Sequence, residues 1–388
     1  MLYRDFQDQK LFLLGFGAMR LPQLADGTID EEQVRQMTRL AIDHGVNYFD
    51  TAWPYHGGQS ERVMGRVLKD YPRESFFLAT KYPGHQIAEK YDPAEIFEKQ
   101  LEKCGVEYFD FYLLHNVNEN SIRTYLDPQW GILEYFREQK RLGRIRHLGF
   151  STHGSVQMME QFLDVCGADM EFCQIQLNYL DWTLQDAKGK YELLTSRGIP
   201  VWVMEPVRGG KLANLGEEDA AALKAKRPEE SVPAWCFRFL QELPNVTMIL
   251  SGMSNLAQME DNLKTFSAPA PLSGEEQALL QTIAEKLKNA VPCTACRYCC
   301  DGCPAKLDIP LLLSIYNDLR CDAGGSVIAT MRVEALEHQP AECVNCGQCT
   351  AACPQNIDVP AALADLAGRI AALPSWGEIC RQRAKQEE

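Results

Sequence analysis

Short apolar runs alternate with longer amphipathic segments along roughly the first 270 residues. Alternation of this kind is typical of an α/β protein with a parallel sheet. Eight runs are strand candidates: residues 12–16, 46–50, 76–81, 109–115, 145–150, 172–177, 200–204 and 246–250. Eight repeats in about 250 residues is the size of a (β/α)8 TIM barrel, which is the predicted fold class for this part of the chain.

A doubly wound sheet is the alternative fold. Its best support would be a glycine-rich dinucleotide loop, and the nearest candidate is G-F-G-A-M-R at residues 15–20. This segment lacks the third glycine and runs into Leu21-Pro22 instead of a helix, so a turn after the first strand is the simpler interpretation.

The barrel pattern ends in the proline-rich stretch F-S-A-P-A-P-L-S-G, and an amphipathic helix pattern follows it. This change in composition predicts a domain boundary. We expect a barrel over residues 1–270, a helical connector over 271–290, a cysteine-rich domain over 291–374 and a tail over 375–388.

The cysteine-rich region carries one spacing twice, C-x2-C-x2-C-x3-C-P, with the two copies fifty positions apart. This spacing is that of a bacterial ferredoxin run, in which the fourth cysteine serves the other cluster. The pattern therefore predicts two [4Fe-4S] clusters with crossed ligand sets. One set is Cys293, Cys296, Cys299 and Cys353, and the other is Cys343, Cys346, Cys349 and Cys303.

Two zinc sites or a disulfide framework are the alternatives to iron-sulfur clusters. Zinc sites more often use two pairs of ligands, and disulfides need an oxidising compartment. Cys300, beside Cys299, is either a spare thiol near the cluster or an alternative ligand, and the spare thiol is the favoured interpretation. The long segment between Cys303 and Cys343 contains helical patterns, so a small, mainly helical two-cluster ferredoxin-like domain is expected.

Charge and hydropathy exclude some partners. The formal net charge of -14 argues against nucleic-acid binding, which needs a basic face. No apolar run is long enough to span a bilayer and the first residues contain no secretory apolar segment, so no membrane insertion and a cytoplasmic location are expected. The fifteen cysteines fit a reducing compartment.

Three consecutive strand candidates end in ionisable residues. Asp50 closes the second, Lys81 the third and His115 the fourth, and Tyr55 lies in the loop after Asp50. A barrel places its active site at the carboxyl ends of its strands, so these four side chains are candidates for catalysis.

At these positions the chain resembles the aldo-keto reductase superfamily. The matching stretches are F-D-T-A-W-P-Y at 49–55, L-A-T-K-Y at 78–82, Y-L-L-H-N at 112–116, G-F-S at 149–151 and E-P-V-R-G-G-K-L at 205–212. The resemblance implies a catalytic tetrad of Asp50, Tyr55, Lys81 and His115. The whole chain is similar to the branch of the superfamily with a C-terminal ferredoxin-type domain.

The resemblance also implies that NADPH or NADH binds across the same face of the barrel. Loops after the seventh and eighth strands commonly hold phosphate, and here they contain R-G-G-K and S-G-M-S-N. The expected cofactor-binding residues are Ser151, Gln174, Asn178, Gly209, Gly210, Lys211, Ser251, Gly252, Gln258 and Asn262. An exposed helix face is an equally good interpretation of Gln258 and Asn262.

The predicted activity is the interconversion of a small-molecule carbonyl and alcohol by an NAD(P)-dependent oxidoreductase. Tyr55 would be the general acid or base, and Lys81 would lower its pKa. The clusters would exchange electrons with an external electron carrier. No flavin motif is recognisable, although a barrel can bind flavin without one. The alternatives are an electron-transfer or redox-sensing protein whose barrel docks a partner or nucleotide, and clusters that only stabilise their domain.

Overall fold

The structure is a computed structural model that describes residues 1–86, 88–287, 291–320, 325–375 and 378. It divides into two compact units. The first contains Met1–Val207 and Ala220–Leu280, and the second contains Arg208–Asp219 and Gln281–Glu388. The second unit therefore includes a segment from within the expected barrel region, which the proposed domain boundaries did not anticipate.

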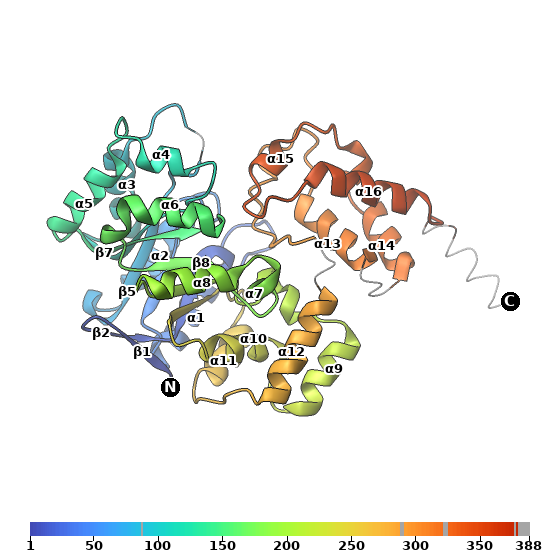
Figure 1. Ribbon diagram of the computed structural model, residues 1–388, viewed down its shortest axis with the longest axis horizontal. Helices are drawn as coiled ribbons and strands as arrows, with labels where there is room; N and C mark the ends of the chain where they lie inside the picture. Colours follow the sequence, from blue (N-terminus) through green and yellow to red (C-terminus); the bar gives the residue numbers. More distant parts are fainter. Residues whose placement is uncertain (87, 288–290, 321–324, 376–377, 379–388) are drawn as a thin grey trace. The chain divides into compact units, whose positions relative to one another are not determined.

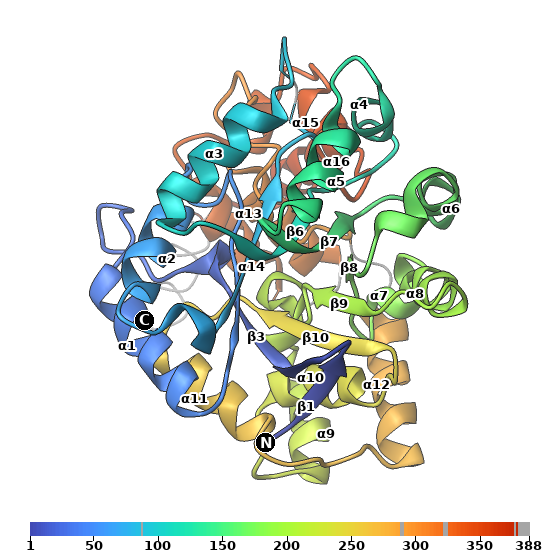
Figure 2. The ribbon, with the colours of Figure 1, turned by 90° about the vertical axis from the view of Figure 1, so that its left-hand side faces the viewer.

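The first unit is a closed barrel of eight parallel strands in the order β10-β3-β4-β5-β6-β7-β8-β9. This confirms the predicted (β/α)8 fold class of that region. Neighbouring strands such as β9 and β10 lie side by side in Figure 2. The strands are β3 (Leu14–Gly17), β4 (Tyr48–Asp50), β5 (Phe77–Tyr82), β6 (Phe109–Leu114), β7 (Ile145–Thr152), β8 (Cys173–Gln176), β9 (Val201–Met204) and β10 (Val246–Ser251).

Helices cover the outside of the barrel in Figure 1. Their apolar faces pack against the outward side chains of the strands, so the strands are buried on both faces. The helices of this region are α1 (Glu31–Asp43), α2 (Ser60–Leu68), α3 (Pro93–Cys104), α4 (Ile122–Leu126), α5 (Ile132–Arg141), α6 (Val156–Cys166), α7 (Asp181–Leu184), α8 (Ala187–Ser196), α9 (Glu217–Lys226), α10 (Val232–Gln241), α11 (Leu256–Thr265) and α12 (Gly274–Leu287).

An antiparallel hairpin of β1 (Tyr3–Phe6) and β2 (Gln9–Phe12) precedes the barrel. Phe6 packs among the aromatic rings of the barrel interior, 5.0 Å from Trp202 and 5.5 Å from Phe111 between ring centroids. The hairpin leads into the amino end of β3, so this aromatic cluster fills the end of the barrel opposite the carboxyl ends of the strands.

The second unit is mainly helical. Its elements are α13 (Ile309–Arg320), α14 (Gly325–Glu334), α15 (Gln348–Ala351) and α16 (Val359–Ala371), with 3-10 turns at Arg208–Ala213 and Pro340–Glu342. Asp308 and Asp358, which are fifty positions apart like the two cysteine runs, accept backbone N–H bonds at the starts of α13 and α16. Cys321, Cys380 and most of the expected tail lie outside the described residues.

No helix within the described ranges combines the length and hydropathy needed to cross a bilayer.

Candidate active site

The four expected catalytic residues gather at the carboxyl ends of adjacent strands. Asp50 ends β4, Lys81 lies near the end of β5, and His115 directly follows β6. The strands are parallel and in register, with Asp50 opposite Ala79, so their carboxyl ends meet at the same edge. Tyr55 reaches this edge from the loop after β4.

Lys81 is the centre of the group. Its Nζ donates to Asp50 Oδ1 at 2.5 Å, to the backbone oxygen of Thr51 at 2.8 Å and to the Tyr55 hydroxyl at 3.3 Å. An ammonium has three donors, and all three find an acceptor here. The geometry therefore suits a protonated lysine that is held against the phenol.

Burial controls the ionisation of this pair. The side chains of Lys81 and Asp50 are 0% and 4% exposed. Burial lowers the pKa of Lys81 and raises the pKa of Asp50. For each residue, the loss of hydration destabilises the charged form more than the attraction between the two charges stabilises it.

Tyr55 differs from the expectation in its acidity. Burial raises its pKa well above the usual value near 10, and the charges of Asp50 and Glu205 raise it further. The prediction that Lys81 brings this pKa down is therefore wrong in this structure, because desolvation is the larger effect. The phenol stays protonated at neutral pH, as a proton donor must.

His115 is held as a neutral imidazole. Burial lowers its pKa well below 6.5, and interactions with His85, Lys81 and His153 lower this pKa further. Its Nδ1 has no hydrogen-bond partner among the described residues. The Tyr55 and His115 rings meet edge to face with centroids 6.0 Å apart, so the two side chains are direct neighbours.

His85 and Tyr125 support His115, and the sequence reasoning missed both. The His85 ring lies 4.5 Å from the His115 ring between centroids. The Tyr125 hydroxyl donates to the carbonyl oxygens of His115 at 2.5 Å and Tyr82 at 3.1 Å. For His85, the available signal was its place in the loop just after the strand that bears Lys81.

Arg20 and Glu205 form a second missed pair near Tyr55. Arg20 Nη2 contacts Glu205 Oε1 at 3.3 Å, and Glu205 has a positive φ of 56°. Both charges act on the Tyr55 phenol, in opposite directions. Glu205 lies in the loop directly after β9.

Trp53 lies two residues before Tyr55, and His153 is close enough to His115 to affect its pKa. Lys103 Nζ lies 3.5 Å from the Trp53 ring centroid, so this ring packs against helix α3. Burial lowers the pKa of His153 to about 3, with the charges of Lys190 and His85 adding to this effect. His153 is thus a neutral group near the other two imidazoles.

Gln174 and Ser151 offer hydrogen-bonding groups that suit a carboxamide such as that of nicotinamide. The two residues are paired across β7 and β8 and are 3% and 1% exposed. Gln174 Oε1 has no hydrogen-bond partner in the described part of the chain, so an amide N–H could donate to it. Ser151 Oγ accepts from the backbone N–H of Asn116 at 2.8 Å, which leaves its hydroxyl proton to donate.

The side-chain amide of Asn178, in contrast, is fully hydrogen-bonded within the protein. Its Nδ2 donates to Asp181 Oδ2 at 2.7 Å and to the backbone oxygen of Glu205 at 3.0 Å. Its Oδ1 accepts from the backbone N–H groups of Leu180 and Asp181. The protein itself therefore uses each hydrogen-bonding group of this amide, and a contact between Asn178 and the cofactor stays a prediction.

The expected cofactor-binding residues at the end of β10 and after it differ in their burial. Asn262 is 5% exposed and donates to Ser251 Oγ at 3.0 Å, so it does not lie on an exposed helix face. Gln258 is exposed, and its Oε1 accepts from the backbone N–H of Ser254 at 2.7 Å. Gly252 is also exposed.

Gly209, Gly210 and Lys211 lie in the turn Arg208–Ala213, which belongs to the second compact unit. The two glycines have φ values of 63° and 92°, which favour glycine. Their role in cofactor binding stays a prediction.

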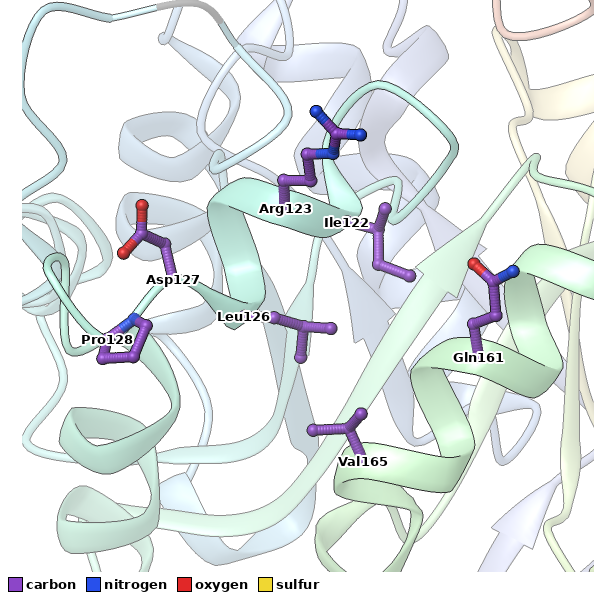
Figure 3. A pocket seen from close by; sticks show the side chains of 7 residues that line it. All are labelled: Ile122, Arg123, Leu126, Asp127, Pro128, Gln161 and Val165. Atoms are coloured by element: carbon purple, nitrogen blue, oxygen red, sulfur yellow. The ribbon is translucent and has the colours of Figure 1, made fainter.

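A separate groove lies on the outer surface between α4 and α6 (Figure 3). The side chains of Ile122, Leu126 and Val165 form its apolar part, and Arg123 and Asp127 are charged groups on the same helix and the turn after it. None of the expected catalytic residues lines this groove. Tyr125 of the same helix points away from it, toward His115.

The second unit brings the eight cysteines of the two runs into two groups of four. One cavity is lined by Cys293, Cys296, Cys299 and Cys353, and the other by Cys303, Cys343, Cys346 and Cys349. Each therefore takes three cysteines from one run and the fourth from the other. Cys300 lines neither cavity.

The two runs also share their backbone conformation. Ala295 and Asn345, fifty positions apart, both have a φ of 56°, and Lys306 and Asn356 both have 51°. The turn from Cys303 to Lys306 closes with a 3.0 Å bond, and its counterpart from Cys353 closes with 3.1 Å. The sequence repeat is therefore a structural repeat.

Within the described residues, no group of three or more His, Cys, Asp or Glu side chains is placed to hold a metal ion. The cysteines described are free thiols, which gives no support to the disulfide alternative. The ferredoxin-type assignment of this unit stays a prediction.

Comparison with known proteins identifies relatives of the barrel. The sequence profile of the Aldo/keto reductase family matches residues 13–285, which is more than half of the chain. L-galactose dehydrogenase of Arabidopsis thaliana is 24% identical over 306 residues, covering 72% of this chain and 92% of the relative. NADH-specific methylglyoxal reductase of Escherichia coli (strain K12) is 24% identical over 288 residues, covering 63% and 85%.

Among solved structures, aldo-keto reductase AKR11C1 from Bacillus halodurans in its holo form superposes with a TM-score of 0.59. It is 24% identical, and the match covers 73% of this chain and 96% of that one. At this identity the likeness shows the fold. The family match ends at residue 285, before the first cysteine run.

Proposed function

Because the chain belongs to the aldo/keto reductase family and is an NAD(P)-dependent oxidoreductase, we propose that its barrel interconverts a carbonyl and an alcohol through Tyr55. The observation that carries this proposal is the chain of contacts from Asp50 through Lys81 to the Tyr55 hydroxyl. Bound NAD(P)H supplies a hydride to the carbonyl carbon. Tyr55 donates the proton that the substrate oxygen needs, which completes the alcohol.

The other residues of the site each have a separate role in the proposed reaction. Lys81 gives hydrogen-bonded positive charge beside the phenol oxygen and stabilises the phenolate that remains after proton transfer. Asp50 orients Lys81. His115, neutral and in contact with the Tyr55 ring, donates a hydrogen bond to the substrate oxygen. Ser151 and Gln174 orient the nicotinamide carboxamide.

The decisive test is Tyr55→Phe, with Tyr135→Phe as a matched control because Tyr135 packs on Phe97 in the outer layer. Carbonyl reduction is followed with NADH and with NADPH. We expect Tyr55→Phe to lower kcat by roughly 100-fold or more while coenzyme binding persists, since general acid catalysis contributes that much. Near-normal turnover in Tyr55→Phe would remove Tyr55 from the mechanism.

For the second unit we propose a ferredoxin-type domain with two [4Fe-4S] clusters that exchange single electrons with an external carrier. The support is the crossed lining of the two cavities, which matches the ligand exchange of two-cluster ferredoxins. Left-handed residues within each run bend the backbone around the cavity. In this proposal the barrel chemistry and the clusters are separate sites.

Crossed ligation gives this proposal a sharp test. Protein purified without oxygen should contain about eight iron and eight sulfide per chain. Cys303→Ser should disrupt the cluster of the Cys343 run, and Cys353→Ser that of the Cys293 run, each losing about half of the iron. Cys300→Ser is the control and should keep all of it. Absence of iron in anaerobic protein contradicts the proposal.

Titration with NADH or NADPH, following the cluster absorbance, then tests electron flow. If NADH or NADPH bleaches the cluster absorbance only when a one-electron carrier is present, the barrel site and the clusters are separate sites. If either nucleotide bleaches the clusters directly, a further group such as a flavin would be required. Clusters that no reductant bleaches would be structural. Failure to bind either nucleotide would favour the alternative in which the barrel is a docking scaffold.

A further inference from the structure

A fully buried carboxylate lies behind the catalytic group. Glu61 of α2 is 0% exposed, and both of its oxygens are used. Oε1 accepts from Thr80 Oγ1 at 2.6 Å and from Gln100 Nε2 at 2.7 Å. Oε2 accepts from Lys103 Nζ at 3.1 Å. A buried charge persists only when it is paired and hydrogen-bonded, and this one is.

One branch of the network reaches the backbone of Lys81. Gln100 Nε2 also donates to the Lys81 carbonyl oxygen at 3.0 Å. The Tyr112 hydroxyl donates to Gln100 Oε1 at 2.5 Å, which fixes the orientation of the amide. Gln100 and Tyr112 are both 0% exposed, so this branch excludes water. The end of β5 that bears Lys81 is therefore tied to Glu61.

The other branch reaches the loop that bears Tyr55. Lys103 contacts Glu61 on one side and lies 3.5 Å from the centroid of the Trp53 ring on the other. Trp53 precedes Tyr55 by two residues in a short loop. A cation over an indole face is attracted to it, so Lys103 holds this loop against α3.

Close packing of two helices makes these contacts reachable. A Cβ atom on Gly65 of α2 would lie 2.5 Å from the backbone oxygen of Cys104 in α3. Only glycine permits this approach, which brings Glu61 within hydrogen-bond distance of Gln100 and Lys103.

We propose that Glu61 is a positioning residue for the reaction, which keeps the Lys81 strand end and the Tyr55 loop in register through Gln100 and Lys103. The inference rests on the proposed roles of Lys81 and Tyr55. The charge of Glu61 also favours the protonated form of Lys81.

Several other charged or titratable groups also lie next to Lys81 or Glu61. Asp50, Tyr55 and His115 face Lys81, while Lys103 and Cys104 face Glu61. Loss of the proton from the Lys81–Tyr55 pair controls the alkaline limb of the kcat profile. Removal of the negative charge of Glu61 favours that loss, and removal of the positive charge of Lys103 opposes it.

The test compares Glu61→Gln with Lys103→Met. We expect both to lower kcat by roughly 10- to 100-fold through misplacement of the reacting groups, with the KM for coenzyme changed less than about twofold. The alkaline limb should move to lower pH in Glu61→Gln and to higher pH in Lys103→Met. A purely structural role would not give opposite shifts.

Asp110→Asn is the matched control. Asp110 is also a buried carboxylate, 1% exposed and paired with Arg73 and Arg146, but it lies toward the amino end of β6. We expect it to lower stability without moving the pH profile.

Wild-type kcat and pH profile in folded Glu61→Gln would overturn the inference. Should Glu61→Gln not fold, Lys103→Met decides, because Lys103 is partly exposed: unchanged kcat there also overturns it. Active Tyr55→Phe would instead show that the proposed mechanism fails, whatever the Glu61 variants do.

Discussion

The buried ion pair of Lys81 and Asp50 predicts an energetic coupling that can be measured. Asp50→Asn keeps the shape of the side chain but leaves the Lys81 ammonium, which is 0% exposed, with two neutral acceptors. Breaking a buried pair in this way costs about 3–5 kcal/mol of unfolding free energy. Lys81→Met should cost a similar amount, because the buried Asp50 carboxylate would lose the Lys81 bond to Oδ1, and its Oδ2 already has no hydrogen-bond partner in the described residues.

The double variant decides whether the cost comes from unpaired charge. With both charges gone, no buried ion remains, so Asp50→Asn with Lys81→Met should cost no more than either single change. The coupling between the two positions should therefore be at least about 3 kcal/mol. If the single costs simply add, the pair does not stabilise the site as the geometry indicates.

Urea denaturation measures these free energies, with fluorescence of the buried Trp202 and Trp235 reporting on the barrel. All four proteins are compared at one pH near neutrality, where Lys81 and Asp50 form the pair. A loss below about 1 kcal/mol for both single variants would refute the reasoning, since that is the value of an exposed pair.

Two further outcomes follow from other contacts. Burial raises the pKa of Glu171, but hydrogen bonds from His147, Lys140 and others lower it to about 2 overall. The stability it contributes is present above its ordinary value of 4.5 and is lost as the pH falls toward 2, so urea titrations should show a flatter acid limb in Glu171→Gln. An acid limb in Glu171→Gln that is as steep as that of the wild type would contradict this prediction. Tyr125→Phe, which frees the carbonyl of His115, should lower kcat by roughly 10-fold at a stability cost of about 1–2 kcal/mol. Steady-state kinetics with unchanged kcat would speak against that role.

The strands of the barrel were predictable because each is buried on both faces. Such strands appear as continuous apolar runs bounded by turns, and all eight lie within two residues of their expected ends. The β1–β2 hairpin was missed, because its strands have four residues each and its turn at Gln7 lacks glycine. The grouping of Arg208–Asp219 with the second unit has no local signal at all, since it depends on contacts distant in sequence.

The sequence predicted which residues form the candidate site, but it did not predict their pKa values or their hydrogen-bond partners. Asp50, Lys81 and His115 could be placed together because parallel strands end at one edge. The raised pKa of Tyr55 could not be predicted, because it depends on how much water the fold removes. For a related reason, the sequence could not show that Asp181 and Glu205 accept hydrogen bonds from the Asn178 amide.

By itself the sequence determined the barrel, the catalytic candidates and the crossed grouping of the eight cysteines, because spacing and periodicity are properties of the chain. Only the tertiary structure decided that Tyr55 stays protonated, that His85 and Tyr125 support His115, and that Glu61 lies behind Lys81. Burial and hydrogen-bond partners set these properties, and both depend on segments that meet only when the chain is folded.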